Sequence, residues 1–136
     1  MKIVLKQVEG NAYVGKGESN HWVPVDTSPS EGGSGAGTGP MELVLIALAG
    51  CTAIDVELIL KKKRSGMKRL EVEVSGERAK NPPRVFTNIH VKYIIHGEVK
   101  RADAEHAVSL SQDKYCSVAG TLRHAVSMTH EIEIVE

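Results

Sequence analysis

Two cysteines, Cys51 and Cys116, are the residues of this sequence best suited to redox chemistry. Cys51 lies in the apolar stretch ALAGCTAIDVE, directly after Gly50, which leaves room beside the sulfur for a substrate or a second backbone. A thiolate that attacks a peroxide becomes a sulfenic acid, and a second thiol condenses with it to form a disulfide. The local sequence leaves open whether Cys51 is a reactive thiol or a small apolar residue packed in a core.

Composition argues against several other classes of function. The six histidines are scattered and there is no CxxC pair, so we expect no closed zinc site and no cofactor. Acidic and basic residues balance at 17 each, which gives no field that favours nucleic acid or a membrane surface. The longest uncharged apolar stretch, 43–54, is well below the roughly 20 residues that span a bilayer. We expect a soluble, cytoplasmic protein, in which two cysteines seldom form a structural disulfide.

The first part of the chain leads into the element that carries Cys51. Residues 1–136 are expected to form a single domain. Short strands are predicted up to residue 26, and the Gly- and Pro-rich segment 27–39 is predicted to be a mobile loop. A helix should begin at Pro40, because proline is well tolerated in the first turn.

This helix is predicted to be long and buried. It should run to about Arg64, with Gly66 just past its end and the basic run KKKR in its last turn. Its first half, LVLIALAGCTAI, is apolar on every side, which is typical of a helix buried all round. Because one subunit of this size struggles to enclose such a helix, we expect a homodimer with the helix at its centre.

The second part of the chain alternates between strand and helix patterns. Strict alternation predicts a half-buried strand over 70–78, and a longer strand follows in 85–97. A helical period extends over 101–115, Cys116 comes at or just after it, and HEIEIVE should end the chain as a strand. Strands and helices are partly segregated, which favours an α+β fold.

Several of these segments together resemble the OsmC/Ohr family (osmotically inducible protein C and organic hydroperoxide resistance protein), and most closely its YhfA-like redox subgroup. They are TGPMELVLIALAGCTAIDVE, LEVEVSGER, PPRVFTNIHVKY and DKYCSVAG. The resemblance covers nearly the whole chain. It implies an OsmC-like fold: an intertwined homodimer with two long central helices flanked by mainly antiparallel sheets. It also implies reduction of organic hydroperoxides at the dimer interface, with Cys51 in the peroxidatic position and Cys116 in the resolving one.

Two residues that activate the thiolate in the family's peroxidases are replaced here. The resemblance implies an arginine in the N-terminal region, yet no arginine precedes Arg64. It also implies a glutamate directly after the helix-opening proline, where this chain has Met41. The acid follows one place later as Glu42, and a shift of one residue turns a side chain by about 100° on a helix.

Other residues are therefore candidates for binding substrate or stabilising the thiolate. They are Met41, Glu42, Lys16, Arg123 and His124, although lysine lacks the fork of hydrogen bonds that arginine offers. We expect Cys51 to attack a small hydroperoxide, Cys116 to close the disulfide, and a cellular dithiol to reduce it. One alternative is a non-catalytic dimer that binds a small apolar or thiol-reactive ligand between its helices. Another is that both cysteines only fill the core.

Overall fold

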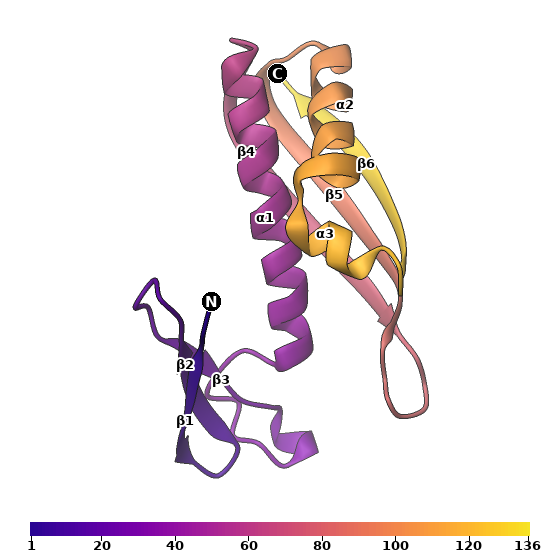
Figure 1. Ribbon diagram of the computed structural model, residues 1–136. Helices are drawn as coiled ribbons and strands as arrows, with labels where there is room; N and C mark the ends of the chain where they lie inside the picture. The colour runs from indigo at the N-terminus through magenta and orange to yellow at the C-terminus, as the bar shows by residue number, and fades with distance from the viewer. The chain divides into compact units, whose positions relative to one another are not determined.

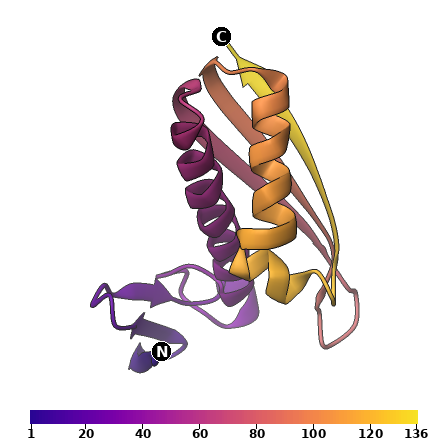
Figure 2. The same cartoon turned by 45° about the horizontal axis from the view of Figure 1, so that its top comes forward.

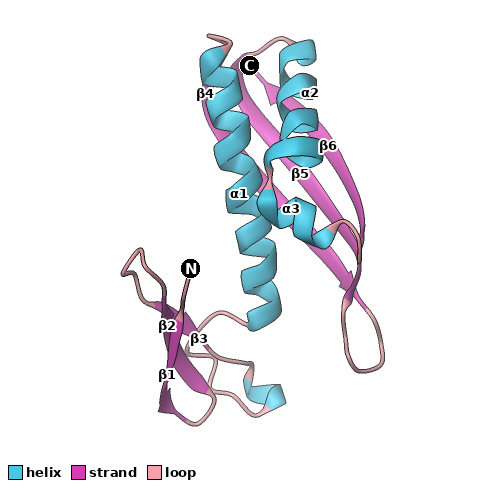
Figure 3. Ribbon diagram, viewed as in Figure 1, coloured by secondary structure: helices cyan, strands magenta, loops and turns pink.

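The computed structural model describes residues 1–136 as two compact units, Met1–Val44 and Leu45–Glu136. The first unit holds a small three-stranded sheet and a loop. The second holds a three-stranded sheet and most of the helical structure (Figures 1 and 3). The boundary between the units falls within helix α1 (Pro40–Lys62), so α1 begins in the first unit and continues through the second.

The sheet of the first unit consists of the short strands that the sequence predicted before residue 26. Strands β1 (Val4–Glu9), β2 (Ala12–Lys16) and β3 (Val23–Val25) are antiparallel and adjacent in chain order. Gly10 turns β1 into β2 with a φ of +56°, a conformation that glycine adopts readily.

The loop 27–39 has more structure than its composition predicted, because it folds around the buried carboxylate of Asp26. That carboxylate accepts hydrogen bonds from the Ser34 hydroxyl (2.6 Å) and from the backbone N–H groups of Thr27, Ser34 and Ala36 (2.7, 3.2 and 3.0 Å). The Ser34 hydroxyl makes the largest contribution to lowering the pKa of Asp26 to about 2, and the N–H groups of Ala36 and Thr27 add to it. A short 3₁₀ turn, η1 (Pro29–Glu31), lies within the loop.

Helix α1 begins at Pro40 as predicted and buries one face in this chain. Every fourth residue along that face is buried, namely Leu48, Thr52, Val56 and Leu60. Three apolar side chains elsewhere on the helix are 53–60% exposed, namely Ile46, Ile54 and Leu58. Burial on all sides, which the sequence predicted, is therefore not reached within a single chain.

The C-terminal end of α1 differs from the prediction in detail. The helix ends at Lys62, and Arg64, with a φ of +52°, is the left-handed residue that follows it. Gly66 instead begins strand β4 (Gly66–Arg78). A Cβ at Gly66 would lie 2.6 Å from the carbonyl oxygen of Glu98, so only glycine allows the two strands to approach this closely.

Length and composition alone would let α1 cross a membrane, and it is the one helix of the chain that is long and apolar enough to do so. The core helix of a soluble protein meets the same test. One face of α1 is buried in this chain, and a single helix of this kind is weak evidence for a membrane span.

The sheet of the second unit is mixed. β4 pairs antiparallel with β5 (Phe86–Glu98), and β5 pairs in parallel with β6 (Ser127–Val135). The predicted strands are confirmed, and the sheets are mainly antiparallel as expected, with β5 and β6 as the one parallel pair. One face of β5 is fully buried, as its alternation indicated, through Ile89, Val91, Tyr93 and Ile95.

Helical segments cover one face of this sheet, with α1 and α2 side by side (Figures 1 and 2). The predicted helix over 101–115 consists of α2 (Arg101–Leu110) and a π-helical turn, η2 (Ser111–Tyr115). Cys116 follows directly, and α3 (Ser117–Leu122) begins after it. Helices on one face of a sheet form a two-layer α+β arrangement, the predicted fold class.

Candidate functional site

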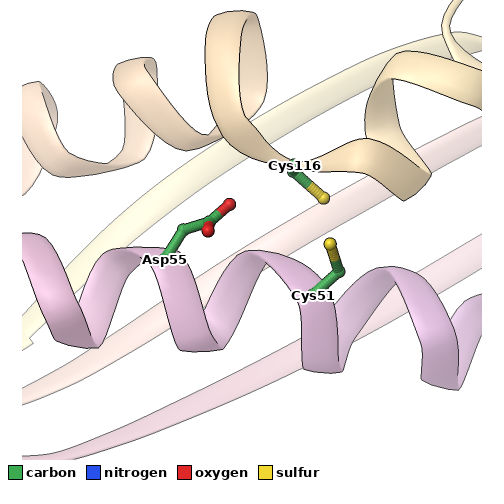
Figure 4. A group of neighbouring side chains, drawn as sticks. All are labelled: Cys51, Asp55 and Cys116. Atoms are coloured by element: carbon green, nitrogen blue, oxygen red, sulfur yellow. The ribbon is translucent and has the colours of Figure 1, made fainter.

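The fold brings Cys51 and Cys116 together although 65 positions separate them in the sequence. Cys51 projects from the middle of α1, and Cys116 lies at the junction of η2 and α3 (Figure 4). Their Sγ atoms and a carboxylate oxygen of Asp55 all lie within 4.8 Å of one another. Both cysteines are free thiols; Cys51 is half-buried, whereas Cys116 is only 2% exposed.

The surroundings of Cys116 favour its protonated form. Burial is the main cause that raises the pKa of Cys116 to about 11, and the neighbouring Cys51 and Asp55 raise it further. The backbone N–H of Ala119 donates a hydrogen bond to Cys116 Sγ at 3.3 Å and partly opposes this shift. Cys116 is therefore a thiol at neutral pH.

Asp55 is the site residue that the sequence analysis missed. It follows Cys51 by four positions on α1, which places the two side chains on the same face of the helix. The Ser111 hydroxyl donates to Asp55 Oδ2 at 3.0 Å. The C-x-x-x-D spacing was the available signal, but the spacing alone does not indicate that Cys116 and Ser111 lie next to Asp55.

A buried network of hydroxyl groups connects Asp55 to the sheet. Thr52 Oγ1 lies 2.6 Å from the Tyr93 hydroxyl and 2.8 Å from Ser111 Oγ, and Gln112 Nε2 donates to the Tyr93 hydroxyl. Because the single hydroxyl hydrogen of Ser111 goes to Asp55, Thr52 must donate to Ser111 and Tyr93 to Thr52. Burial raises the pKa of Tyr93 and keeps it a donor. The hydroxyl groups of Tyr93, Thr52 and Ser111 thus each donate in the direction of Asp55.

The predicted cationic candidates have partners of their own. Lys16 Nζ donates to Asn20 Oδ1 at 2.8 Å and lies 4.7 Å from the centre of the Trp22 ring. Arg123 donates to the backbone carbonyl of Asp113 at 3.2 Å. None of the hydrogen bonds or ion pairs of the two cysteines and Asp55 comes from a lysine or arginine.

The remaining predicted residues have structural surroundings. Glu42 Oε2 accepts a hydrogen bond from the Gly39 N–H at 2.9 Å, so this acid caps the start of α1. Met41 is half-buried in the first turn of the same helix, and His124 is exposed after α3. Roles of Met41, Glu42 and His124 in substrate binding stay predictions.

These observations define the class of protein. An OsmC-like protein family model matches residues 32–131. Protein YhfA of Escherichia coli K12 is 42% identical over 136 residues, which cover 99% of this chain and 98% of YhfA. The chain therefore belongs to the OsmC-like family, and YhfA is a relative along its full length.

Solved structures show the same fold. An OsmC-like protein from Mycoplasma pneumoniae has a TM-score of 0.85 at 18% identity, and the match covers 99% of this chain and 96% of the Mycoplasma chain. An organic hydroperoxide resistance protein OsmC from Legionella pneumophila has a TM-score of 0.74 at 15% identity, and the match covers 98% of this chain and 97% of the Legionella chain. At these identities the likeness concerns the fold.

Proposed function

We propose that the protein is a thiol-dependent redox protein that reduces organic hydroperoxides through Cys51 and Cys116. The observation that carries this proposal is the cluster of two free thiols within 4.8 Å in an OsmC-like fold. Organic hydroperoxide resistance is named for the fold relative from Legionella pneumophila, and comes to this chain as part of the proposal.

The two cysteines would take different parts in the reaction. Cys51 is the more exposed of the two, so its thiolate attacks the terminal peroxide oxygen, which yields an alcohol and a Cys51 sulfenic acid. Cys116, held as a thiol by burial, then attacks this sulfur and releases water as the disulfide forms. A cellular dithiol returns both cysteines to thiols through a mixed disulfide.

The exposed face of α1 supports a homodimer. Four residues at successive helical turns lie on it: Ile46, Gly50, Ile54 and Leu58. A Cβ at Gly50 would meet no atom within 4 Å, so this position leaves space for the backbone of a second helix. A second copy that covers this face would bury α1 on all sides, and we place the dimer in the cytoplasm.

One observation favours a second candidate function, the binding of a small apolar ligand without turnover. A cavity of about 410 Å³ lies between α1 and α2 and includes Asp55 of the cluster; it is lined by Asp55, Leu58, Ile59, Lys62, Lys63, His106, Leu110 and Tyr115. This volume lies within the range of small-molecule sites. A ligand held there would stabilise the protein against heat, and that stabilisation would survive Cys51→Ser.

Intact-mass analysis of the reduced, metal-free protein tests the redox proposal. After brief exposure to one equivalent of cumene hydroperoxide, the wild type should lose two hydrogen atoms. Cys116→Ser should instead gain one oxygen at Cys51, and Cys51→Ser should stay unchanged. An unchanged wild-type mass, or equal oxidation of Cys51→Ser, would refute the proposal and leave ligand binding as the function to pursue.

A further inference from the structure

We propose that reduced Cys51 and Cys116, together with Asp55, form a binding site for a thiophilic divalent cation, and that zinc fits it best. The three donor atoms come from one helix face and from the turn opposite it, and they lie within 4.8 Å of one another. In a tetrahedral zinc site, bonds of about 2.0–2.3 Å place neighbouring ligand atoms roughly 3.3–3.8 Å apart. A contraction of about 1 Å therefore converts the cluster into a coordination site.

The chemistry of the donors selects the metal. Two cysteines bind as thiolates, which favours zinc and other soft cations over the magnesium and calcium that prefer oxygen ligands alone. As metal ligands, the two thiolates and the carboxylate carry three negative charges, and no lysine or arginine donates to any of them. A divalent cation supplies the positive charge that the protein leaves out at this point, and its binding releases the thiol protons.

Neighbouring groups already orient two of the three ligands. The Ser111 hydroxyl holds Asp55 Oδ2, at the end of the hydroxyl chain from Tyr93 and Thr52, and leaves Oδ1 for a metal. The Ala119 N–H donates to Cys116 Sγ, an interaction that also stabilises a metal-bound thiolate. Outer hydrogen bonds of this kind fix ligand orientation in metal sites, and their loss typically costs 10–100-fold in metal affinity or activity.

The site offers three protein ligands and a route to it. Asp55 also lines the cavity of about 410 Å³, so a cation can reach the cluster from that side. Three ligands leave the fourth tetrahedral position to water or another small molecule, as in zinc sites that are not purely structural. The inference goes beyond the proposed redox function. It concerns the reduced protein without peroxide, and a Cys51–Cys116 disulfide would abolish the site.

Titration with Co²⁺ tests the site, because cobalt bound by thiolates shows a sulfur-to-metal charge-transfer absorption. The reduced protein, freed of metal and kept anaerobic, should develop this absorption up to one equivalent per chain and lose it when Zn²⁺ is added. Protein previously oxidised to the disulfide should show none. The wild type alone therefore decides the matter: a missing absorption, or equal binding by the oxidised protein, overturns the proposal.

Variants assign the ligands. Cys51→Ser and Cys116→Ser should each abolish tight binding, and Asp55→Asn should weaken it at least about tenfold. Glu57→Gln is the matched control, since Glu57 lies on the same helix but pairs with Lys61, and it should bind as the wild type does. Circular dichroism verifies that each variant is folded. Equal affinity of folded Asp55→Asn and Glu57→Gln contradicts the proposal. Because peroxide oxidation is measured without metal, failure there and failure here are separate results.

Discussion

Replacement of Asp55 by asparagine should make Cys116 a stronger acid. Asparagine keeps an oxygen that accepts from Ser111 but removes the negative charge that helps to raise the pKa of Cys116. At a separation of up to 4.8 Å, the Coulomb energy of two unit charges is about 0.9–3.5 kcal/mol for effective dielectric constants of roughly 80–20. That range corresponds to about 0.6–2.5 pK units. Because Asp55 is half-buried and reached by water, and is the smallest of the causes that raise this pKa, we expect a decrease at the lower end of that range, about 0.6 units.

The rate of alkylation of Cys116 measures this change. The Cys51→Ser protein has Cys116 as its single thiol, so its rate with and without Asp55→Asn isolates the effect of the carboxylate. Metal-free samples over about pH 7–10 should show the pH profile displaced by about 0.6 units, which means up to about fourfold more thiolate at a given pH. A full profile is needed because a more acidic thiol is also a weaker nucleophile. Profiles that coincide, with Glu57→Gln as the control, would show that Asp55 is not close to Cys116.

Three further predictions concern stability and assembly. Thr52→Val removes a hydroxyl that bonds to both Tyr93 and Ser111 in the core, and should lower the free energy of unfolding in urea by about 1–3 kcal/mol. The pKa of Asp26 is lower in the folded state than its ordinary value, so its stabilising contribution is complete above about pH 4 and is lost as pH falls through about 2. Urea midpoints between these pH values should therefore decline less steeply in Asp26→Asn than in the wild type. Ile54→Glu places a charge on the exposed apolar face of α1 and should convert the dimer into monomers in sedimentation velocity. A wild-type protein that is already monomeric would refute the dimer.

Elements with a strong local pattern could be predicted from the sequence. The helix that begins at Pro40 follows from its opening proline, its long apolar run and the basic residues at its end. The strand with Ile89 and Val91 on one face follows from apolar alternation. The distance between Cys51 and Cys116 could not be predicted from the segments around them. The resemblance to the OsmC/Ohr family is what assigned the two residues to the peroxidatic and resolving positions.

Features that depend on distant partners could not be predicted. The apolar and polar alternation of β6 is the same whether the strand runs parallel or antiparallel to β5. The glycines of the loop 27–39 indicated a mobile segment. The sequence pattern gives no sign that Ser34 and Ala36 would donate hydrogen bonds to Asp26. Asp55 is one of three acids in an apolar helix, and its position beside Cys116 depends on the path of a segment about 60 residues later.

The electrostatics of the cysteine pair connect the two proposals. A thiolate is usually stabilised by a nearby cation or helix N-terminus, whereas here the carboxylate of Asp55 lies within 4.8 Å of both sulfurs. Cys116 therefore holds its proton until positive charge arrives from outside the site. A divalent cation delivers that charge directly. A peroxide does not, so closure of the disulfide requires either a cation from the second copy of the chain or attack by the small thiolate fraction of Cys116. If closure uses that small fraction, its rate should rise with pH and should increase in Asp55→Asn. Asp55→Asn should also weaken metal binding. Faster closure of the disulfide after reaction with peroxide, together with a lower metal affinity, would separate a redox role for Asp55 from a ligand role.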